Sequence, residues 1–288
     1  MYNPLADAGY VEMNGETSEM QFLDARYYLS EVYPRLKLPL PDAYPLVRLD
    51  SAAGYHSLGS HPLLMLVALT GTGKSTTLAC LRQNLGPEGM GVIPSRRELA
   101  DWIALPMMQT LNGEATRPVA DRVRRFAYTR SFAERVPGGM AAAFSWLYLA
   151  DSFSDLVIAE GIRGGNEMRH ALTRFPAWRI VELTLDPLTR LRRLSERRDR
   201  FDRAAGAADL SFLPCELREE AQTMLAAGEI DARAIAIMGA EVENYGLLPF
   251  AAGHQYRNYH RIAVDQRSPE QVAREVAQIV EAIANAQG

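Results

Sequence analysis

A polar, glycine-containing segment at residues 70–76 follows an apolar run at residues 63–69 and leads into a stretch of helical character. Its glycines allow backbone N–H groups to turn inward around an anion, and a helix that begins there adds its positive end. A lysine in such a loop reaches the β and γ phosphates of a nucleotide, and the hydroxyl after it binds Mg²⁺. We therefore predict a phosphate loop, with Ser75 as the Mg²⁺ ligand, made of Thr70, Gly71, Thr72, Gly73, Lys74, Ser75 and Thr76.

Ala68 occupies the position at which loops of this kind usually have their first glycine. Because that position closes the strand and accepts a small side chain, the expected loop changes little. The alternative is an ordinary glycine turn between a strand and a helix, with Lys74 in solvent. The order of apolar strand, glycine turn and helix favours the phosphate loop.

A second apolar run, residues 156–160, ends in Glu160 and is followed by Gly161. In a doubly wound parallel sheet, ligands lie beyond the carboxyl ends of the strands, so Glu160 is expected in the same crevice as Lys74. There it can orient a Mg²⁺-bound water or accept the proton of an attacking hydroxyl. A carboxylate that only caps the loop at residues 162–166 is the alternative.

Three arginines stand close to predicted strand ends. Arg163 follows Glu160 by three residues, and a guanidinium beside a phosphate site can bind two phosphate oxygens at once. Arg96 and Arg97 lie in the first turn of a predicted helix, where two positive charges are unfavourable unless an anion compensates them. Arg96 and Arg97 are therefore candidates for binding an acceptor, with a solvated pair of loop arginines as the alternative.

Residues 189–203 are rich in arginine and place Arg190, Arg193, Arg197 and Arg200 at helical spacing. Such a run is often a solvated helix face. Here it directly follows a predicted core strand in a chain that has a phosphate loop. We therefore predict an arginine lid in which Arg193 and Arg197 close over the phosphates and stabilise charge on the transferred group.

Short apolar runs separated by amphipathic stretches dominate the chain after residue 60. This alternation is typical of a parallel sheet with helical crossovers and predicts an α/β fold. The proline-containing residues 1–60 are interpreted as an N-terminal extension with one helix at residues 18–33. The predicted sheet is doubly wound and parallel, with five strands at residues 63–69, 91–93, 156–160, 179–185 and 261–264.

Three predicted helices begin at residues that cap helices well. The last of them carries an apolar stripe at helical spacing, so the chain is expected to end in a helix packed on the sheet. The three starts are Ser95 with Glu98, Asp186 with Pro187, and Ser268 with Pro269 and Gln271.

The bulk composition is that of an ordinary soluble globular protein. The 288 residues, 48% hydrophobic and 23% charged, are enough for one large α/β domain, and the net charge of −4 supports neither a nucleic-acid nor a membrane partner. The two cysteines, Cys80 and Cys215, have no metal-ligand spacing, and no apolar run is long enough to span a bilayer. We expect a cytoplasmic protein.

Three segments together resemble a known family. They are Thr70-Gly-Thr-Gly-Lys-Ser75, Ala159-Glu-Gly-Ile-Arg-Gly-Gly-Asn-Glu167, and Leu185-Asp-Pro followed by Arg193, Arg197 and Arg198. With these segments, the chain resembles the P-loop nucleotide-kinase-like proteins related to adenylate kinase and dephospho-CoA kinase, over residues 62–286. The resemblance implies a five-stranded sheet of the P-loop NTPase kind, helical acceptor and lid regions, and the use of ATP and Mg²⁺.

The resemblance also implies a division of the chain and the roles of single residues. Gly71, Gly73, Lys74 and Ser75 match the ATP loop, Glu160 and Arg163 the acidic strand end, and Arg193 and Arg197 the lid. Residues 1–60 would be an extension and residues 61–288 the kinase-like domain, with a helical insert at 95–153 and the lid region at 186–228. The long insert, Glu160 in place of the more frequent Asp, and the extension depart from the family pattern and bear on the acceptor more than on the fold.

Two functions remain open at this point. The first is a phosphotransferase that moves the γ-phosphoryl group of ATP to a nucleoside, a nucleotide or a related metabolite. The second is a regulatory NTPase or nucleotide switch whose extension engages a protein partner. No Asn-Lys-x-Asp motif supports a GTPase, and no Asp-Glu pair ends the strand at 156–160 as in ATPase motors. The expected partners are ATP and a small-molecule acceptor, without nucleic acid or membrane, and a homodimer is left open.

Overall fold

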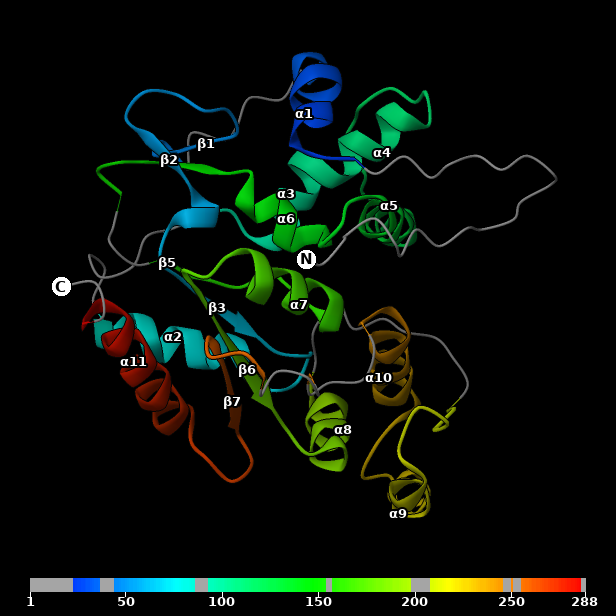
Figure 1. The fold of residues 1–288 in the computed structure, drawn as a ribbon. Helices are drawn as coiled ribbons and strands as arrows, with labels where there is room; N and C mark the ends of the chain where they lie inside the picture. The colour runs from blue at the N-terminus through cyan, green and yellow to red at the C-terminus, as the bar shows by residue number, and fades with distance from the viewer. Residues whose placement is uncertain are drawn as a thin grey trace.

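A parallel sheet of four strands lies at the centre of the computed structural model, which describes residues 23–36, 44–85, 93–153, 157–197, 208–245, 250 and 255–285 (Figure 1). The strand order is β5 (Val157–Ala159), β3 (Leu63–Val67), β6 (Trp178–Thr184) and β7 (Tyr259–Ala263). Met65 pairs with Ala159 on one side and with Ile180 on the other. The strand that carries the phosphate loop is therefore an interior strand.

The predicted α/β fold with a parallel sheet is confirmed, and four of the five predicted strands are present among the described residues. The fifth, at residues 91–93, is not confirmed. Ile93 lies outside any strand, and residues 91 and 92 lie outside the described part of the chain.

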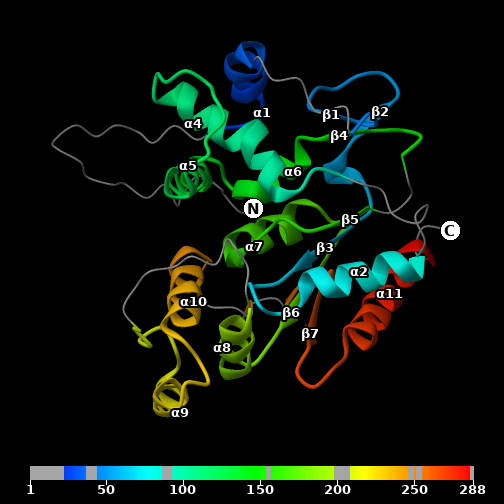
Figure 2. The same cartoon turned by 180° about the vertical axis from the view of Figure 1, so that it is seen from behind.

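Side chains of β3 alternate between two cores because successive strand residues point to opposite faces. Leu64 and Leu66 belong to one core with residues of α2 (Lys74–Leu85) and α11 (Pro269–Asn285). These two helices lie side by side along one face of the sheet in both views (Figures 1 and 2). The buried stripe Val272, Val276 and Val280 is the apolar face that the sequence predicts for the final helix.

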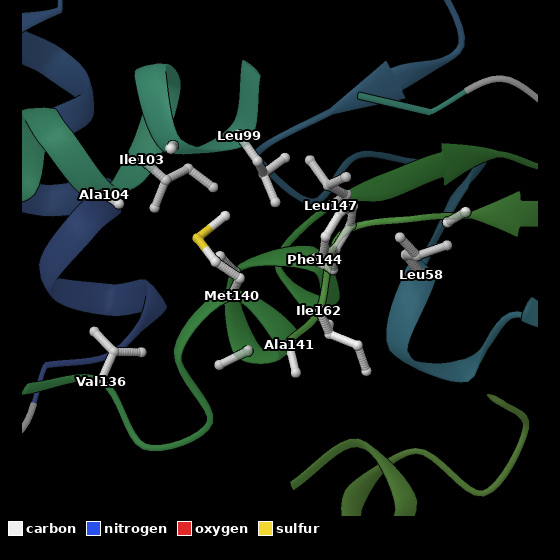
Figure 3. Packing of buried hydrophobic residues seen from close by; sticks show 14 of the residues in the cluster. Leu58, Leu99, Ile103, Ala104, Val136, Met140, Ala141, Phe144, Leu147 and Ile162 are labelled. Carbon is white, nitrogen blue, oxygen red and sulfur yellow. The ribbon is translucent and has the colours of Figure 1, made fainter. Parts of the chain in front are cut away.

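The opposite face of the sheet is covered by α7 (Gly164–Arg174) and by a helical region. That region packs Leu99 and Ile103 against Met140 and Phe144, as Figure 3 shows. Its elements are α3 (Arg96–Leu99), η5 (Ala100–Ala104), α4 (Leu105–Leu111), α5 (Arg122–Arg135) and α6 (Gly139–Ser145).

The segment before residue 60 packs into the same core as the helical region. Tyr28 and Val32 are buried there, both in η1 (Tyr28–Val32), which lies between the short turns α1 (Ala25–Tyr27) and η2 (Tyr33–Arg35). Two short strands, β1 (Val47–Arg48) and β2 (Tyr55–Ser57), pair antiparallel with β4 (Tyr148–Ala150) and lead through η3 (Leu58–Ser60) into β3. Of the helix predicted at residues 18–33, residues 18–22 lie outside the described part of the chain.

Three helices after β6 form a third apolar cluster. They are α8 (Pro187–Glu196), α9 (Cys215–Ala226) and α10 (Ala232–Tyr245), and their buried residues include Leu191, Leu194 and Ile235. In Figure 2, α8 stands between the end of β6 and α10. None of the helices that the structure describes is long and apolar enough to cross a membrane.

All three predicted helix starts are confirmed by their hydrogen bonds. Ser95 and Glu98 form a reciprocal capping box, and Asp186 Oδ2 accepts from the N–H of Thr189 at 2.8 Å. Ser268 Oγ accepts from the N–H of Gln271 at 3.3 Å, and the Gln271 side chain accepts from the N–H of Ser268 at 2.8 Å.

Replacing Leu66 by Ala should lower the free energy of unfolding by about 2–5 kcal/mol, because it empties space at the centre of the sheet, where Leu66 is fully buried. Leu46→Ala is the control, since that side chain is 40% exposed and its loss should cost less than about 0.5 kcal/mol. Urea denaturation of both variants measures the difference. Similar losses would contradict the described core.

Candidate active site

The predicted phosphate loop, residues 70–76, contains two glycines in the left-handed region of backbone conformation. Gly71 and Gly73 have φ angles of +86° and +99°, which residues with a Cβ atom rarely adopt. α2 begins at Lys74, so the N–H groups of its first turn are free of helical partners and point towards the loop. Ser75 and Thr76 are exposed on this turn. Such an arrangement is suited to bind an anion.

Lys74 and Glu160 meet beyond the carboxyl ends of β3 and β5. Lys74 Nζ lies 2.7 Å from Glu160 Oε2, and the two side chains are 17% and 37% exposed. Oε2 is buried and accepts no well-oriented hydrogen bond, so the ammonium charge is its compensation. Burial lowers the pKa of Lys74, Glu160 opposes this shift, and the nearby charges of Arg163 and Arg96 add to it. The pair therefore lies among further cations, which favours an anionic ligand.

Arg96, a candidate for binding the acceptor, is paired with Glu167. Its two terminal nitrogens lie 2.7 and 3.1 Å from the carboxylate oxygens, and Nη1 also donates to the carbonyl of Gly161 at 2.5 Å. Burial alone lowers the pKa of Arg96, but Glu167 more than offsets this and the pKa is raised. The anion that compensates this helix start is thus a carboxylate of the protein itself. Arg97, on the same turn, is exposed.

Glu167 holds the turn that carries Glu160 and Arg163. Its side chain is 8% exposed, and besides Arg96 it accepts hydrogen bonds from the N–H groups of Arg163 at 2.6 Å and Met140 at 3.2 Å. The sequence analysis gave Glu167 no role. Glu167 lies in the first turn of α7, a helix that the sequence analysis did not predict, and an acidic residue at a helix start is the signal that such a prediction would have supplied.

The Arg163 guanidinium lies over the ring of Tyr245, at 5.5 Å from its centroid. This cation–π contact joins the turn after β5 to the end of α10. Among the described carboxylates, none forms an ion pair with Arg163.

Helix α8 packs directly on the phosphate loop. Arg190 Nε donates to the carbonyl of Thr70 at 2.7 Å, and Arg190 Nη2 pairs with Glu241 of α10. Glu241 in turn accepts from Thr70 N at 3.2 Å and from Thr70 Oγ1 at 2.5 Å. Burial lowers the pKa of Arg190, and Glu241 opposes that shift. This closed, buried network fixes the first residue of the loop, and the sequence analysis missed Glu241.

The two predicted lid arginines differ in their positions. A Cβ atom on Gly73 would lie 4.0 Å from Arg193 Nη1, so Arg193 borders the loop. Arg197 is exposed at the end of α8, where its carbonyl accepts a hydrogen bond from Arg233 at 2.8 Å. Residues 198–207 of the predicted lid, with Arg198 and Arg200, lie outside the described residues.

No family model matches the sequence, and no curated protein is significantly similar to it. Solved kinase structures are similar to the chain. For a sugar kinase from Janibacter sp., the identity is 14% and the TM-score 0.38, over 77% of this chain and 98% of that one. For a gluconokinase from Sinorhizobium meliloti, the identity is 11% and the TM-score 0.39, over 81% of this chain and 98% of that one. For a shikimate kinase from Aquifex aeolicus, the identity is 16% and the TM-score 0.30, over 77% of this chain and 98% of that one. These TM-scores are too low to support an argument about function. The proposed function therefore depends on the residues of the site.

Replacing Glu167 by Ala should lower the free energy of unfolding by about 3 kcal/mol, because it leaves Arg96 without its carboxylate in a mostly buried place. The matched control is Glu31→Ala, which breaks the exposed Glu31–Arg35 pair and should cost less than about 1 kcal/mol. Urea titrations at pH 7 compare the two variants. Equally small losses would show that Glu167 does not hold the turn.

Proposed function

We propose that the protein is an ATP-dependent kinase that transfers the γ-phosphoryl group to a hydroxyl of a small acceptor. The observation that carries the proposal is the 2.7 Å ion pair between Lys74 and Glu160, beyond adjacent parallel strands. Phosphoryl transfer to a hydroxyl needs a cation at the phosphates and a base at the acceptor, and these two residues supply them. A nucleoside, a nucleotide or a related metabolite is the proposed acceptor class.

Nucleotide binding would change the partner of Lys74. In the structure, the ammonium is compensated by Glu160. Phosphates held in the loop carry more charge than one carboxylate and would take its place. Glu160 would then accept the proton of the acceptor hydroxyl while that oxygen attacks the γ phosphorus, and the bond to the β,γ-bridging oxygen would break to release ADP.

The surrounding arginines have separate roles in this proposal. Arg193, which borders Gly73, would stabilise negative charge on the γ-phosphoryl group. Arg163, beside Glu160, would bind an anionic group of the acceptor or the phosphoryl group itself. Arg97 is the exposed member of the predicted acceptor pair, while Arg96 acts by holding Glu167.

Mg²⁺ fits the donor chemistry of this site. The hydroxyl of Ser75, exposed on the first turn of α2, is the kind of hard oxygen ligand that Mg²⁺ prefers. The described residues contain no group of three or more His, Cys, Asp or Glu that would hold a metal ion. The ion would therefore share its coordination between Ser75, water and the nucleotide phosphates. When bound, Mg²⁺ neutralises phosphate charge.

The regulatory switch is less well supported than the kinase. It requires an N-terminal extension that is available to a partner, whereas in the described part of this segment Tyr28, Val32 and Leu49 are buried in the core of the helical region. Stimulation of ATP turnover by one member of a panel of nucleosides, nucleotides and coenzyme precursors would support the kinase. Stimulation by a protein alone would support the switch.

Lys74→Ala should abolish turnover and weaken ATP binding at least tenfold, whereas Glu160→Gln should lower kcat at least a hundredfold with a small change in ATP affinity. Glutamine keeps the shape of the side chain and removes the base. Calorimetry with ATP and steady-state kinetics separate the two effects, and circular dichroism checks the fold. Unchanged ATP affinity in folded Lys74→Ala, or a wild-type rate in Glu160→Gln, would refute the corresponding role.

Arg193→Ala should lower kcat by roughly 10³-fold with little loss of ATP affinity, because an arginine at the transferred group acts mainly in the transition state. Arg193→Lys should recover only part of the rate, since lysine lacks the planar fork. Arg197→Ala is the comparison from the same helix, where we expect a smaller effect because Arg197 is exposed. Wild-type rates in all three variants would mean that Arg193 and Arg197 form only a solvated face of α8.

A further inference from the structure

A groove of about 620 Å³ is lined by β7, by the start of β6 and by the second half of α11. Among the described strands, β7 pairs only with β6 and is therefore an outer strand of the sheet. Ile262 of β7 shares a core with the buried valines of α11, and the two elements lie at the same end of the sheet (Figures 1 and 2). The volume of the groove is in the range of small-molecule sites.

The wall of the groove carries clustered positive charge. Arg179 of β6, Arg257 just before β7 and Arg261 within β7 all contribute to it. The carboxylate among the described wall residues is Glu275, which pairs with Arg267 outside the wall. The groove is thus a positive place on a chain whose net charge is −4.

Two of these arginines have no carboxylate partner in the part of the chain that the structure describes. Arg179 is partly buried, and its Nη1 donates to the backbone carbonyls of Pro176 at 3.0 Å and Trp178 at 3.4 Å. Arg257 is exposed at the start of β7. The buried cations around the predicted phosphate loop, by contrast, each have a glutamate partner. Clustered, uncompensated positive charge in a groove favours an anionic ligand.

His260 of β7 lies in the same wall. Burial lowers the pKa of His260, and the positive charge of Arg179 adds to that shift. An anion bound between the two side chains would act in the opposite direction and raise the pKa. The imidazole therefore reports whether the groove is occupied.

We infer that this groove binds a small organic molecule that carries two or more carboxylate or phosphate groups. Guanidinium groups bind both kinds of oxyanion through paired N–H donors. Ile262 and Ile279 add an apolar surface to the wall, which suits a ligand with a short carbon skeleton.

The groove is separate from the candidate active site. β6 lies between β7 and β3, so a whole strand separates the groove from the strand that leads into the predicted phosphate loop. Arg179 and Arg257 lie at the amino ends of their strands, whereas Lys74 and Glu160 meet beyond the carboxyl ends of β3 and β5. The inference therefore does not depend on the proposed function.

Citrate and pyrophosphate are suitable probes because they carry several carboxylates or phosphates, and glycerol is the uncharged control. NMR titrations of the full chain measure the pKa of His260 with and without each probe, and His260→Gln assigns its resonances. His170 of α7, whose pKa is also lowered by burial, is the control in the same spectra. The shifts at pH 7 give the Kd of each probe for the unaltered chain, for Arg257→Ala and for Arg35→Ala, an exposed arginine outside the wall.

We expect citrate or pyrophosphate, but not glycerol, to raise the pKa of His260 by about half a unit or more and to leave His170 unchanged. Arg257→Ala should raise the Kd about fivefold or more because a charge-assisted contact is lost, with no change in Arg35→Ala. A response to citrate alone assigns the groove to carboxylates, and a response to pyrophosphate alone assigns it to phosphates. An unchanged pKa of His260 with both probes, or equal losses of affinity in Arg257→Ala and Arg35→Ala, would overturn the inference.

Discussion

Buried positive charge around the predicted phosphate loop is the constraint on which the candidate site depends. Three cations lie there with little solvent, and each is compensated by one glutamate: Lys74 by Glu160, Arg96 by Glu167 and Arg190 by Glu241. A buried cation without such a partner is strongly unfavourable, so each pair ties two segments of the chain together. The sheet places the loop, and the three glutamates hold the surrounding helices against it.

The three ion pairs differ in how exposed they are and in how many further hydrogen bonds hold their glutamates. Arg190 and Glu241 are 5% and 10% exposed, and Arg96 and Glu167 are 22% and 8% exposed, with additional backbone hydrogen bonds at both glutamates. Glu160 is 37% exposed, and its Oε2 has no well-oriented hydrogen bond to lose. In the proposed kinase, Lys74 would exchange Glu160 for a phosphate, while the other two pairs keep the surrounding helices in place. The proposed function therefore needs two fixed pairs, Arg96–Glu167 and Arg190–Glu241, and one exchangeable pair, Lys74–Glu160.

The local parts of this arrangement can be predicted from the sequence. Each of these parts depends on residues only a few positions apart, so its sequence pattern predicts it. They are the glycines of the loop, the apolar strands around it, and the capping residues Ser95, Asp186 and Ser268. Glu241 is different, because it meets Thr70 across 171 positions and sits within an ordinary amphipathic helix. The small antiparallel sheet is also missed, since its strands have two or three residues and no alternating pattern. Arg96 shows the same limit. The sequence indicates that this arginine at a helix start needs an anion, but only the tertiary fold shows that the anion is Glu167.

The central claim is that nucleotide phosphates replace Glu160 as the partner of Lys74. The most direct measurement is a crystal structure of the protein with Mg²⁺ and a non-hydrolysable ATP analogue. The account predicts Lys74 Nζ within hydrogen-bond distance of the β or γ phosphate and no longer 2.7 Å from Glu160 Oε2, with the carboxylate facing the open acceptor side. An analogue bound elsewhere, with the Lys74–Glu160 pair intact, would contradict it.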